Sequence, residues 1–130
     1  MSQEFKIPQE IKNEQLWRKR CRKIRARASD LLEGRLGIIE AARELLPLAS
    51  QTKVEDEPEF RVFLEIDLAT RFLPIGEVRA YWAPDALARE DIRIRAAETR
   101  WDESARSAAA RLVERYQWTI RRRDSLPIDE

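Results

Sequence analysis

The segment FRVFLEIDLATRFLPIGEVRAYW, residues Phe60–Trp82, decides the fold class of this chain. Within its first nine residues, Val62, Leu64, Ile66 and Leu68 alternate with Phe63, Glu65 and Asp67, which could be a short strand. They also give a helix one distinct side, made of Phe60, Phe63, Leu64 and Asp67. A strand needs a pairing partner, and the chain contains no second convincing alternating run. We therefore expect a helix at Phe60–Leu68, then a turn at Leu73–Gly76 and a short helix at Glu77–Trp82.

Long amphipathic helices are predicted on both sides of this segment. Before it, helical periodicity runs from Pro8 to about Leu32, with a core-facing stripe of Trp17, Cys21, Ile24, Ala28, Leu31 and Leu32. A second helix is predicted from Ile38 to about Pro47. Gly34 and Gly37 lie between the two helices, so the second is either a separate helix or a kinked continuation of the first. One long helix is predicted from Ala83 to about Arg122, with a break allowed near Asp91. Its stripe is Leu87, Ile94, Ala97, Trp101, Ala105, Ala108, Leu112 and Tyr116.

The composition agrees with one helical domain. The chain has 130 residues, only three of them glycine, and it is rich in Ala, Arg, Glu and Leu, which favour helix. We expect an all-α fold over residues 1–130, a compact bundle of two long helices, one medium helix and short central helices. Residues 1–6 and 125–130 are expected to be disordered tails, and residues 50–59 an acidic loop.

The residue types exclude several kinds of active site. The chain has no histidine, and its one cysteine, Cys21, lies on a core-facing stripe. Cys–His, Ser–His–Asp and Cys/His zinc chemistry are therefore excluded. No glycine-rich phosphate loop occurs, so we expect no catalytic residues, no metal and no cofactor, with carboxylate chemistry as the enzymatic alternative. The lack of a signal peptide and of an apolar run of ~20 residues predicts a cytoplasmic protein without a membrane partner.

Charge is distributed unevenly, although the net charge is only +1. Residues 1–35 carry ten Lys or Arg against five acids, whereas residues 36–75 carry four against eight. The densest basic run is Arg18–Arg27, and a second cluster follows at Arg121, Arg122 and Arg123. On a helix the first run spreads around the whole polar side, which is typical of a solvated face. Phosphate contact through Arg18, Lys19, Arg22 and Lys23, or contact with an acidic protein, is the alternative.

The central segment also holds the best candidates for specificity. Asp67 and Arg79 are charged residues in apolar surroundings within one loop's reach of each other. We expect them to pair across the Leu73–Gly76 turn, with Trp82 stacked over the guanidinium group. The pair is either a structural ion pair or the polar anchor of a docking edge. Trp118 lies off the stripe of its helix, so it packs inside the fold, the favoured alternative, or contacts a partner.

Two segments of the chain are similar to parts of a known family. One is Leu31–Arg43 (LLEGRLGIIEAAR); the other, Ile66–Leu87, contains the strings ID, LPIGEVR and WAPDAL. Together they resemble a family of small, uncharacterised bacterial cytoplasmic proteins, over about Ala28–Leu112. Members tend to have a polar Ser-Glu-Thr-like triplet after Ile-Asp, where this chain has Leu68-Ala69-Thr70-Arg71. The resemblance implies no activity, but small proteins of this kind are often immunity proteins, encoded beside a toxin domain.

We therefore expect a protein-binding module, most concretely an immunity protein that neutralises a cognate bacterial toxin by covering its active site. The acidic loop would face a basic cleft, and aromatic residues would supply desolvated contacts. The expected partner-binding residues are Glu55, Asp56, Glu57, Glu59, Glu65, Asp67, Arg79, Trp82 and Trp118. The alternative is a nucleic-acid-binding protein that uses residues 18–27 and 121–123.

Overall fold

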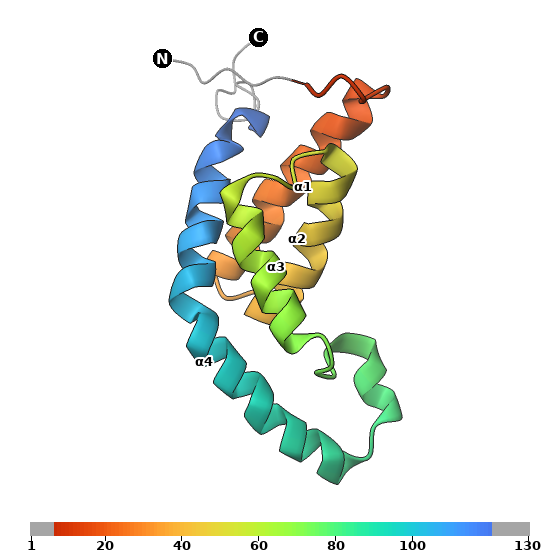
Figure 1. Ribbon diagram of the computed structural model, residues 1–130, viewed down its shortest axis with the longest axis vertical. Coiled ribbons are helices and arrows are strands. Elements are labelled where there is room, and N and C mark those ends of the chain that lie inside the picture. The colour runs from red at the N-terminus through yellow and green to blue at the C-terminus, as the bar shows by residue number, and fades with distance from the viewer. Residues whose placement is uncertain (1–6, 121–130) are drawn as a thin grey trace.

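A computed structural model describes residues 7–120 and confirms the all-α prediction (Figure 1). Within these residues there is no strand, and the ambiguous segment Phe60–Leu68 is helical. The helices are α1 (Glu14–Leu32), α2 (Ile38–Thr52), α3 (Pro58–Thr70) and α4 (Pro84–Arg115), with two short 3-10 helices, η1 (Gly76–Tyr81) and η2 (Gln117–Thr119).

The four α-helices form a bundle in which each packs against two main neighbours. α1 packs on α2 and α4, and α3 packs on the same two helices from the other side. α1 and α3 therefore lie on opposite sides of the bundle, and Figure 1 shows α3 in front with α1 behind it. The outward faces of α1 and α3 consequently point in opposite directions.

The core forms where the inner stripes of the helices meet. α1 contributes the stripe predicted from its periodicity, and α4 contributes small residues that let it approach the other helices closely. The largest fully buried side chains include Ile24, Leu31, Ile39, Leu45, Phe60, Phe63, Ile66 and Leu112. Each buried side chain of this size stabilises the fold by about 1.5–3 kcal/mol relative to an exposed one, so burial of these stripes supplies most of the driving force.

Two boundaries of the long helices differ from the prediction. α1 begins at Glu14 and not at Pro8, because the Asn13 side chain accepts a hydrogen bond from the Leu16 N–H at 3.0 Å and caps the helix there. α4 runs unbroken past Asp91 but ends at Arg115, before the predicted Arg122. α1 and α2 are separate helices. The turn between them contains Gly34, whose backbone has a φ of 80°, in the left-handed conformation that glycine adopts most readily.

The prediction that α2 ends near Pro47 is wrong, because the helix continues through this proline to Thr52. Pro47 has no N–H to donate to the Arg43 carbonyl, but its ring lies on the exposed side. The buried stripe continues beyond it through Ala49 and Thr52. Thr52 is also bonded to α1, since the Trp17 indole N–H donates to its carbonyl at 2.9 Å. Tertiary burial therefore outweighs the local penalty, and the predicted acidic loop shrinks to residues 53–57.

Residues 71–97 extend beyond the end of the bundle, and we call this part the hook. It consists of the loop 71–75, η1 and the first half of α4, and it lies at the lower end of Figure 1, far from the N-terminal end of α1 and the C-terminal end of α4. α4 has 32 residues, so it is about 48 Å long and only its second half fits against the shorter helices. η1 contains no buried residue. Within the hook only Pro74 and Ile94 are buried, so most of it is thinly covered by the rest of the protein.

Candidate functional site

The predicted acidic docking edge is largely consumed by internal contacts. Glu59 is only 3% exposed, and both of its carboxylate oxygens accept hydrogen bonds from Arg115 at 3.0 Å. Glu57 accepts a hydrogen bond from the Tyr116 hydroxyl at 2.9 Å. Burial raises the pKa of Glu57, an effect that this hydrogen bond and the charge of Arg115 oppose. Of the predicted loop acids, Glu55 and Asp56 are the ones that stay exposed for a partner.

The predicted pair between Asp67 and Arg79 is wrong, because each side chain has other partners. Arg79 donates to both carboxylate oxygens of Asp91, at 2.9 and 3.2 Å, and to the Pro74 carbonyl at 3.1 Å. Hydrogen bonding to Arg79 lowers the pKa of Asp91. Asp67 instead forms ion pairs with Arg71 at 3.2 Å and with Arg43 at 3.9 Å. Arg79 thus fastens η1 to α4 and does not fasten it to α3.

Arg43 holds the start of the hook from the other side, a role that sequence reasoning missed. Its Nη2 donates to the carbonyls of Thr70 at 2.7 Å, Leu73 at 3.2 Å and Arg71 at 3.3 Å. These carbonyls lie at the C-terminus of α3 and in the following turn, where the helix leaves its last acceptors unsatisfied. One arginine from α2 therefore fixes the direction in which the chain leaves α3. The sequence carries no signal for this long-range contact.

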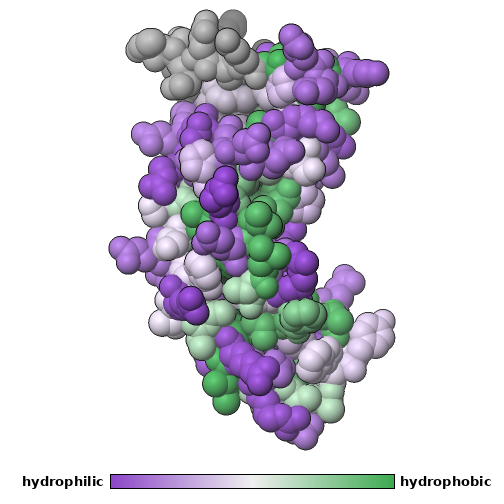
Figure 2. Space-filling model, viewed as in Figure 1, coloured by the Kyte–Doolittle hydropathy of each residue, from purple (hydrophilic) through white to green (hydrophobic). Residues whose placement is uncertain are grey.

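An exposed apolar surface covers the outer side of α3 and continues into the hook. Phe72 is 89% exposed and Tyr81 is 88% exposed, the two largest values among the large apolar side chains in the described residues. We call this surface the apolar face, and it consists of Leu64, Leu68, Phe72, Val78, Tyr81 and Trp82. Figure 2 shows apolar side chains gathered along the front of the bundle, where α3 lies, and at the end that carries the hook. Such a surface on a monomer is typical of an interaction site.

Sequence reasoning found only part of the apolar face. Trp82 was among the expected partner-binding residues and is partly exposed, whereas Phe72 and Tyr81 were not selected. The detectable signal was the spacing of four between Leu64, Leu68 and Phe72, which places all three on one side of a helix. The spacing does not say whether this side faces the core or the solvent. The core-facing set, Phe60, Phe63 and Ile66, had to be known before the outward side could be identified. Glu65, also predicted, lies exposed on the same helix.

Trp118 packs inside the fold, as the favoured alternative stated. Its ring stacks on Trp17, with centroids 5.6 Å apart and an angle of 17° between the planes. The Arg18 guanidinium lies over the Trp118 ring at 5.7 Å, and Tyr116 packs against it at 6.3 Å. Trp118 is therefore already engaged by α1, and it is not the free binding residue that its position off the stripe suggested.

The basic run of α1 is only partly neutralised. Arg18 pairs with Glu14 at 2.8 Å. Within the described part of the chain, Lys19, Arg22 and Lys23 form no ion pair, and all three are exposed. They lie on the side of the bundle opposite α3. The second predicted cluster, Arg121–Arg123, lies outside the described residues.

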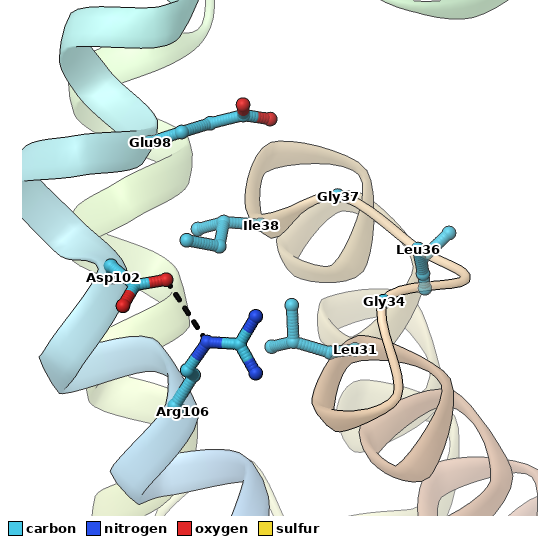
Figure 3. A pocket seen from close by; sticks show the side chains of 8 residues that line it. All are labelled: Leu31, Gly34, Leu36, Gly37, Ile38, Glu98, Asp102 and Arg106. Carbon is cyan, nitrogen blue, oxygen red and sulfur yellow. Dashed lines mark hydrogen bonds and ion pairs between the residues drawn. The ribbon is translucent and has the colours of Figure 1, made fainter.

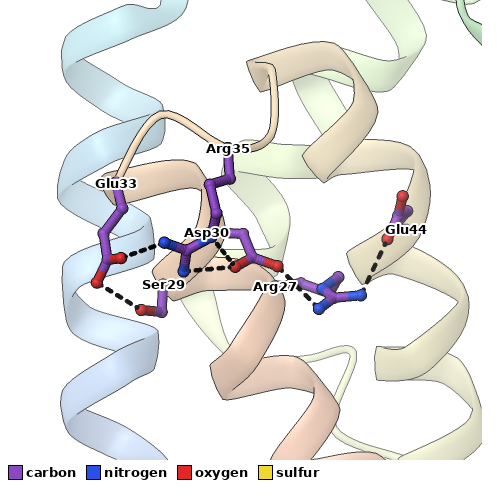
Figure 4. A network of polar contacts seen from close by, with 6 residues as sticks. All are labelled: Arg27, Ser29, Asp30, Glu33, Arg35 and Glu44. Atoms are coloured by element: carbon purple, nitrogen blue, oxygen red, sulfur yellow. Dashed lines mark hydrogen bonds and ion pairs between the residues drawn. The ribbon is translucent and has the colours of Figure 1, made fainter.

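A polar network ends the basic run at the corner between α1 and α2 (Figure 4). Arg27 forms ion pairs with Asp30 at 2.8 Å and with Glu44 of α2 at 3.8 Å. Asp30 also accepts hydrogen bonds from Arg35 at 2.8 and 3.0 Å, and Arg35 pairs with Glu33. The charges of this corner are therefore largely satisfied within the fold, which argues against its use as a phosphate site.

A shallow pocket of about 230 Å³ lies between this corner and α4 (Figure 3). Its polar groups are Glu98, Asp102 and Arg106, and the Arg106 Nε donates to Asp102 at 3.0 Å. Burial raises the pKa of Glu98, and repulsion from Glu40 raises it further. In residues 7–120, no group of three or more Asp, Glu or Cys side chains is arranged to hold a metal ion. Asp102 is engaged by Arg106 within the fold.

Comparisons with known proteins give no further assignment. No protein-family model, curated protein or solved structure matches this chain. The resemblance described from the sequence therefore stays a prediction. Among the described helices, none combines the length and apolar character required to cross a bilayer.

Proposed function

We propose that this protein is a protein-binding module and that it docks through the apolar face. The observation that carries this proposal is the near-complete exposure of Phe72 and Tyr81 beside the exposed leucines of α3. Aromatic residues are enriched at binding hot spots because they bring a large apolar area with few rotatable bonds. Leaving them in water is unfavourable for an isolated protein, so a partner that covers them explains their position.

The size of the apolar face suits a specific interface. With about 200 Å² for a large side chain, the exposed fractions of its six residues leave roughly 700 Å² open, more than the largest patch on a typical monomer. A standard interface buries about 800 Å² on each partner. The partner is therefore a folded protein surface of ordinary size, in preference to a short peptide.

The narrower form of the proposal is toxin neutralisation by occlusion. Glu65 is an exposed acid on α3 next to Leu64 in the sequence, and Glu55 and Asp56 are exposed acids in the loop that precedes α3. A basic substrate cleft would be attracted to these acids while the apolar residues supply desolvated contact. Because Glu57, Glu59 and Asp67 have internal partners, the acidic contribution rests on three residues and not on the six first expected.

Site-specific photo-crosslinking in native cells tests docking. A photo-reactive residue at Phe72 or Tyr81 should give a discrete protein adduct, and the same residue at Ile92 should not. Ile92 is a matched control because it is 62% exposed but lies about 200° around α4 from the buried Ile94. The adduct should also be lost when Leu68→Arg is added to the chain. Equal adducts at all three positions, or none at Phe72 and Tyr81, would contradict the proposal.

A second candidate function, nucleic-acid binding, is favoured by the exposed cations of α1. Lys19, Arg22 and Lys23 have no ion-pair partner in the described residues, and they face away from the apolar face. For duplex DNA, log K falls as log salt rises, and reversing all three charges should reduce the magnitude of this slope by about 3. Reversing Arg89, Arg93 and Arg95 on α4 changes the charge equally and serves as the control. Equal losses from both triple variants would indicate a non-specific charge effect.

A further inference from the structure

We propose that the occupant of the apolar face is a second copy of this chain, bound through a two-fold axis that passes near Leu68. This inference rests on the proposed function, because it names the partner of the same surface. In such a dimer α3 of one protomer crosses α3 of the other, and the two hooks extend around the contact.

The spacing of the exposed residues on α3 supports contact between two like helices. Leu64 and Leu68 lie one turn apart on the exposed side of α3. Phe72 follows at the same spacing two residues after the helix ends, where Arg71 keeps helical backbone angles, so it continues the same ridge. Ridges of this kind interdigitate with identical ridges when two helices cross at about 50°, the commonest packing of helices in globular proteins. Leu68 is the middle residue of the ridge, so it lies at the crossing point, where a two-fold axis is expected.

Charge is compatible with a second copy. Residues 61–95, which contain the apolar face and most of the hook, carry six Lys or Arg and six Asp or Glu. Two such neutral surfaces approach each other without net repulsion. The unpaired cations of α1 would remain on the outside of the dimer, because α1 lies on the opposite side of the bundle from α3.

Measurement of mass against concentration tests the inference with the intact chain. Light scattering or sedimentation should show the mass rise from 15.3 kDa toward twice that value as concentration passes a Kd of about 1 μM or less, as expected for a standard interface. Phe72→Ser with Tyr81→Ser should raise this Kd at least about tenfold, a loss of 1.4 kcal/mol. Ile92→Ser should leave it unchanged, and circular dichroism checks that each variant is folded.

Disulfide formation gives a second, geometric test. Cys21 is fully buried, and burial raises its pKa to about 12, so an introduced cysteine is the one reactive thiol expected among the described residues. Leu68→Cys should form a covalent dimer readily under mild oxidation, because the two copies meet at this residue. Ile92 has an exposed fraction similar to that of Leu68 and lies on the side of α4 opposite the buried Ile94. Ile92→Cys should therefore form far less covalent dimer.

The outcomes separate the inference from the proposed function. A mass of 15.3 kDa at about 100 μM, where a micromolar dimer is mostly assembled, overturns self-association. A different protein crosslinked at Phe72 then still supports a docking module. A dimer that survives the Phe72→Ser and Tyr81→Ser changes, or that crosslinks equally through Ile92→Cys, also overturns the inference. The absence of both a dimer and a crosslinked partner overturns the two proposals together.

Discussion

Arg79 in η1 donates two hydrogen bonds to Asp91 in α4. The two residues are twelve positions apart in the sequence, and their contact closes the hook. The same guanidinium group bonds the Pro74 carbonyl, so one side chain joins the turn, η1 and α4. Arg79→Ala should therefore loosen η1 without unfolding the bundle, since η1 buries no residue of its own. Hydrogen exchange should become faster in residues 74–83 and stay unchanged in α1 and α2. Faster exchange across the whole chain would mean that the hook supports global stability.

The contact between Glu59 and Arg115 should show an asymmetric response to mutation. Arg115→Ala leaves a carboxylate that is 3% exposed with only Arg111, at 3.7 Å, as a cationic neighbour, and should lower the free energy of unfolding by about 3 kcal/mol. Glu59→Gln leaves an arginine whose side chain is 41% exposed to solvent, so the expected loss is about 1–2 kcal/mol. Urea unfolding measures both values. Equal losses would indicate that the pair acts as a surface ion pair.

The pH dependence of stability should contain a contribution from Glu57. Its pKa is raised, chiefly by burial, so the folded state binds a proton more tightly than the unfolded state does. The associated stabilisation is fully present below the unfolded pKa, about 4.3, and is lost as the pH rises through the higher pKa of the folded state. Glu57→Gln should therefore flatten the fall of stability with rising pH in that range. Thermal unfolding from pH 4 to 7 measures the difference, and the exposed control Glu55→Gln should change nothing.

Binding and stability should separate between the inner side of α3 and the loop that follows it. Phe72→Ser should change the free energy of unfolding by no more than about 0.5 kcal/mol, because the ring is 89% exposed. Phe63→Ala, nine residues earlier and fully buried, should lower it by about 3–5 kcal/mol. Denaturant unfolding distinguishes them. A large loss from Phe72→Ser would show that this side chain supports the fold and would weaken its role in docking.

Periodicity predicted the helices well because the core consists mostly of regular stripes. Six α1 residues were selected from spacing alone. Trp17, Cys21, Ile24, Ala28 and Leu31 are buried, and Leu32 is partly buried. Local rules failed where tertiary contacts outweighed them. Pro47 does not end α2, since Ala49 and Thr52 continue its buried stripe.

The candidate site was less predictable than the fold, because it depends on which side chains find partners. Asp67 and Arg79 are close enough in sequence to pair, yet the path of the loop gives each another partner. Arg43 sets that path from 27 residues away, and no spacing rule reports such a contact. Exposure of Phe72 and Tyr81 follows only once the position of η1 is known.

The continuity of α4 has a consequence for the thermodynamics of association. Because one helix passes without interruption from the hook into the bundle, the first half of α4 is held by a second half whose Ala105, Ala108, Ala109 and Leu112 are completely enclosed. The Arg79–Asp91 pair fastens η1, which carries Val78 and Tyr81, to this held part of α4, so this part of the apolar face is pre-organised. It should lose little conformational entropy when a partner arrives, and tight association should be attainable from a modest contact area.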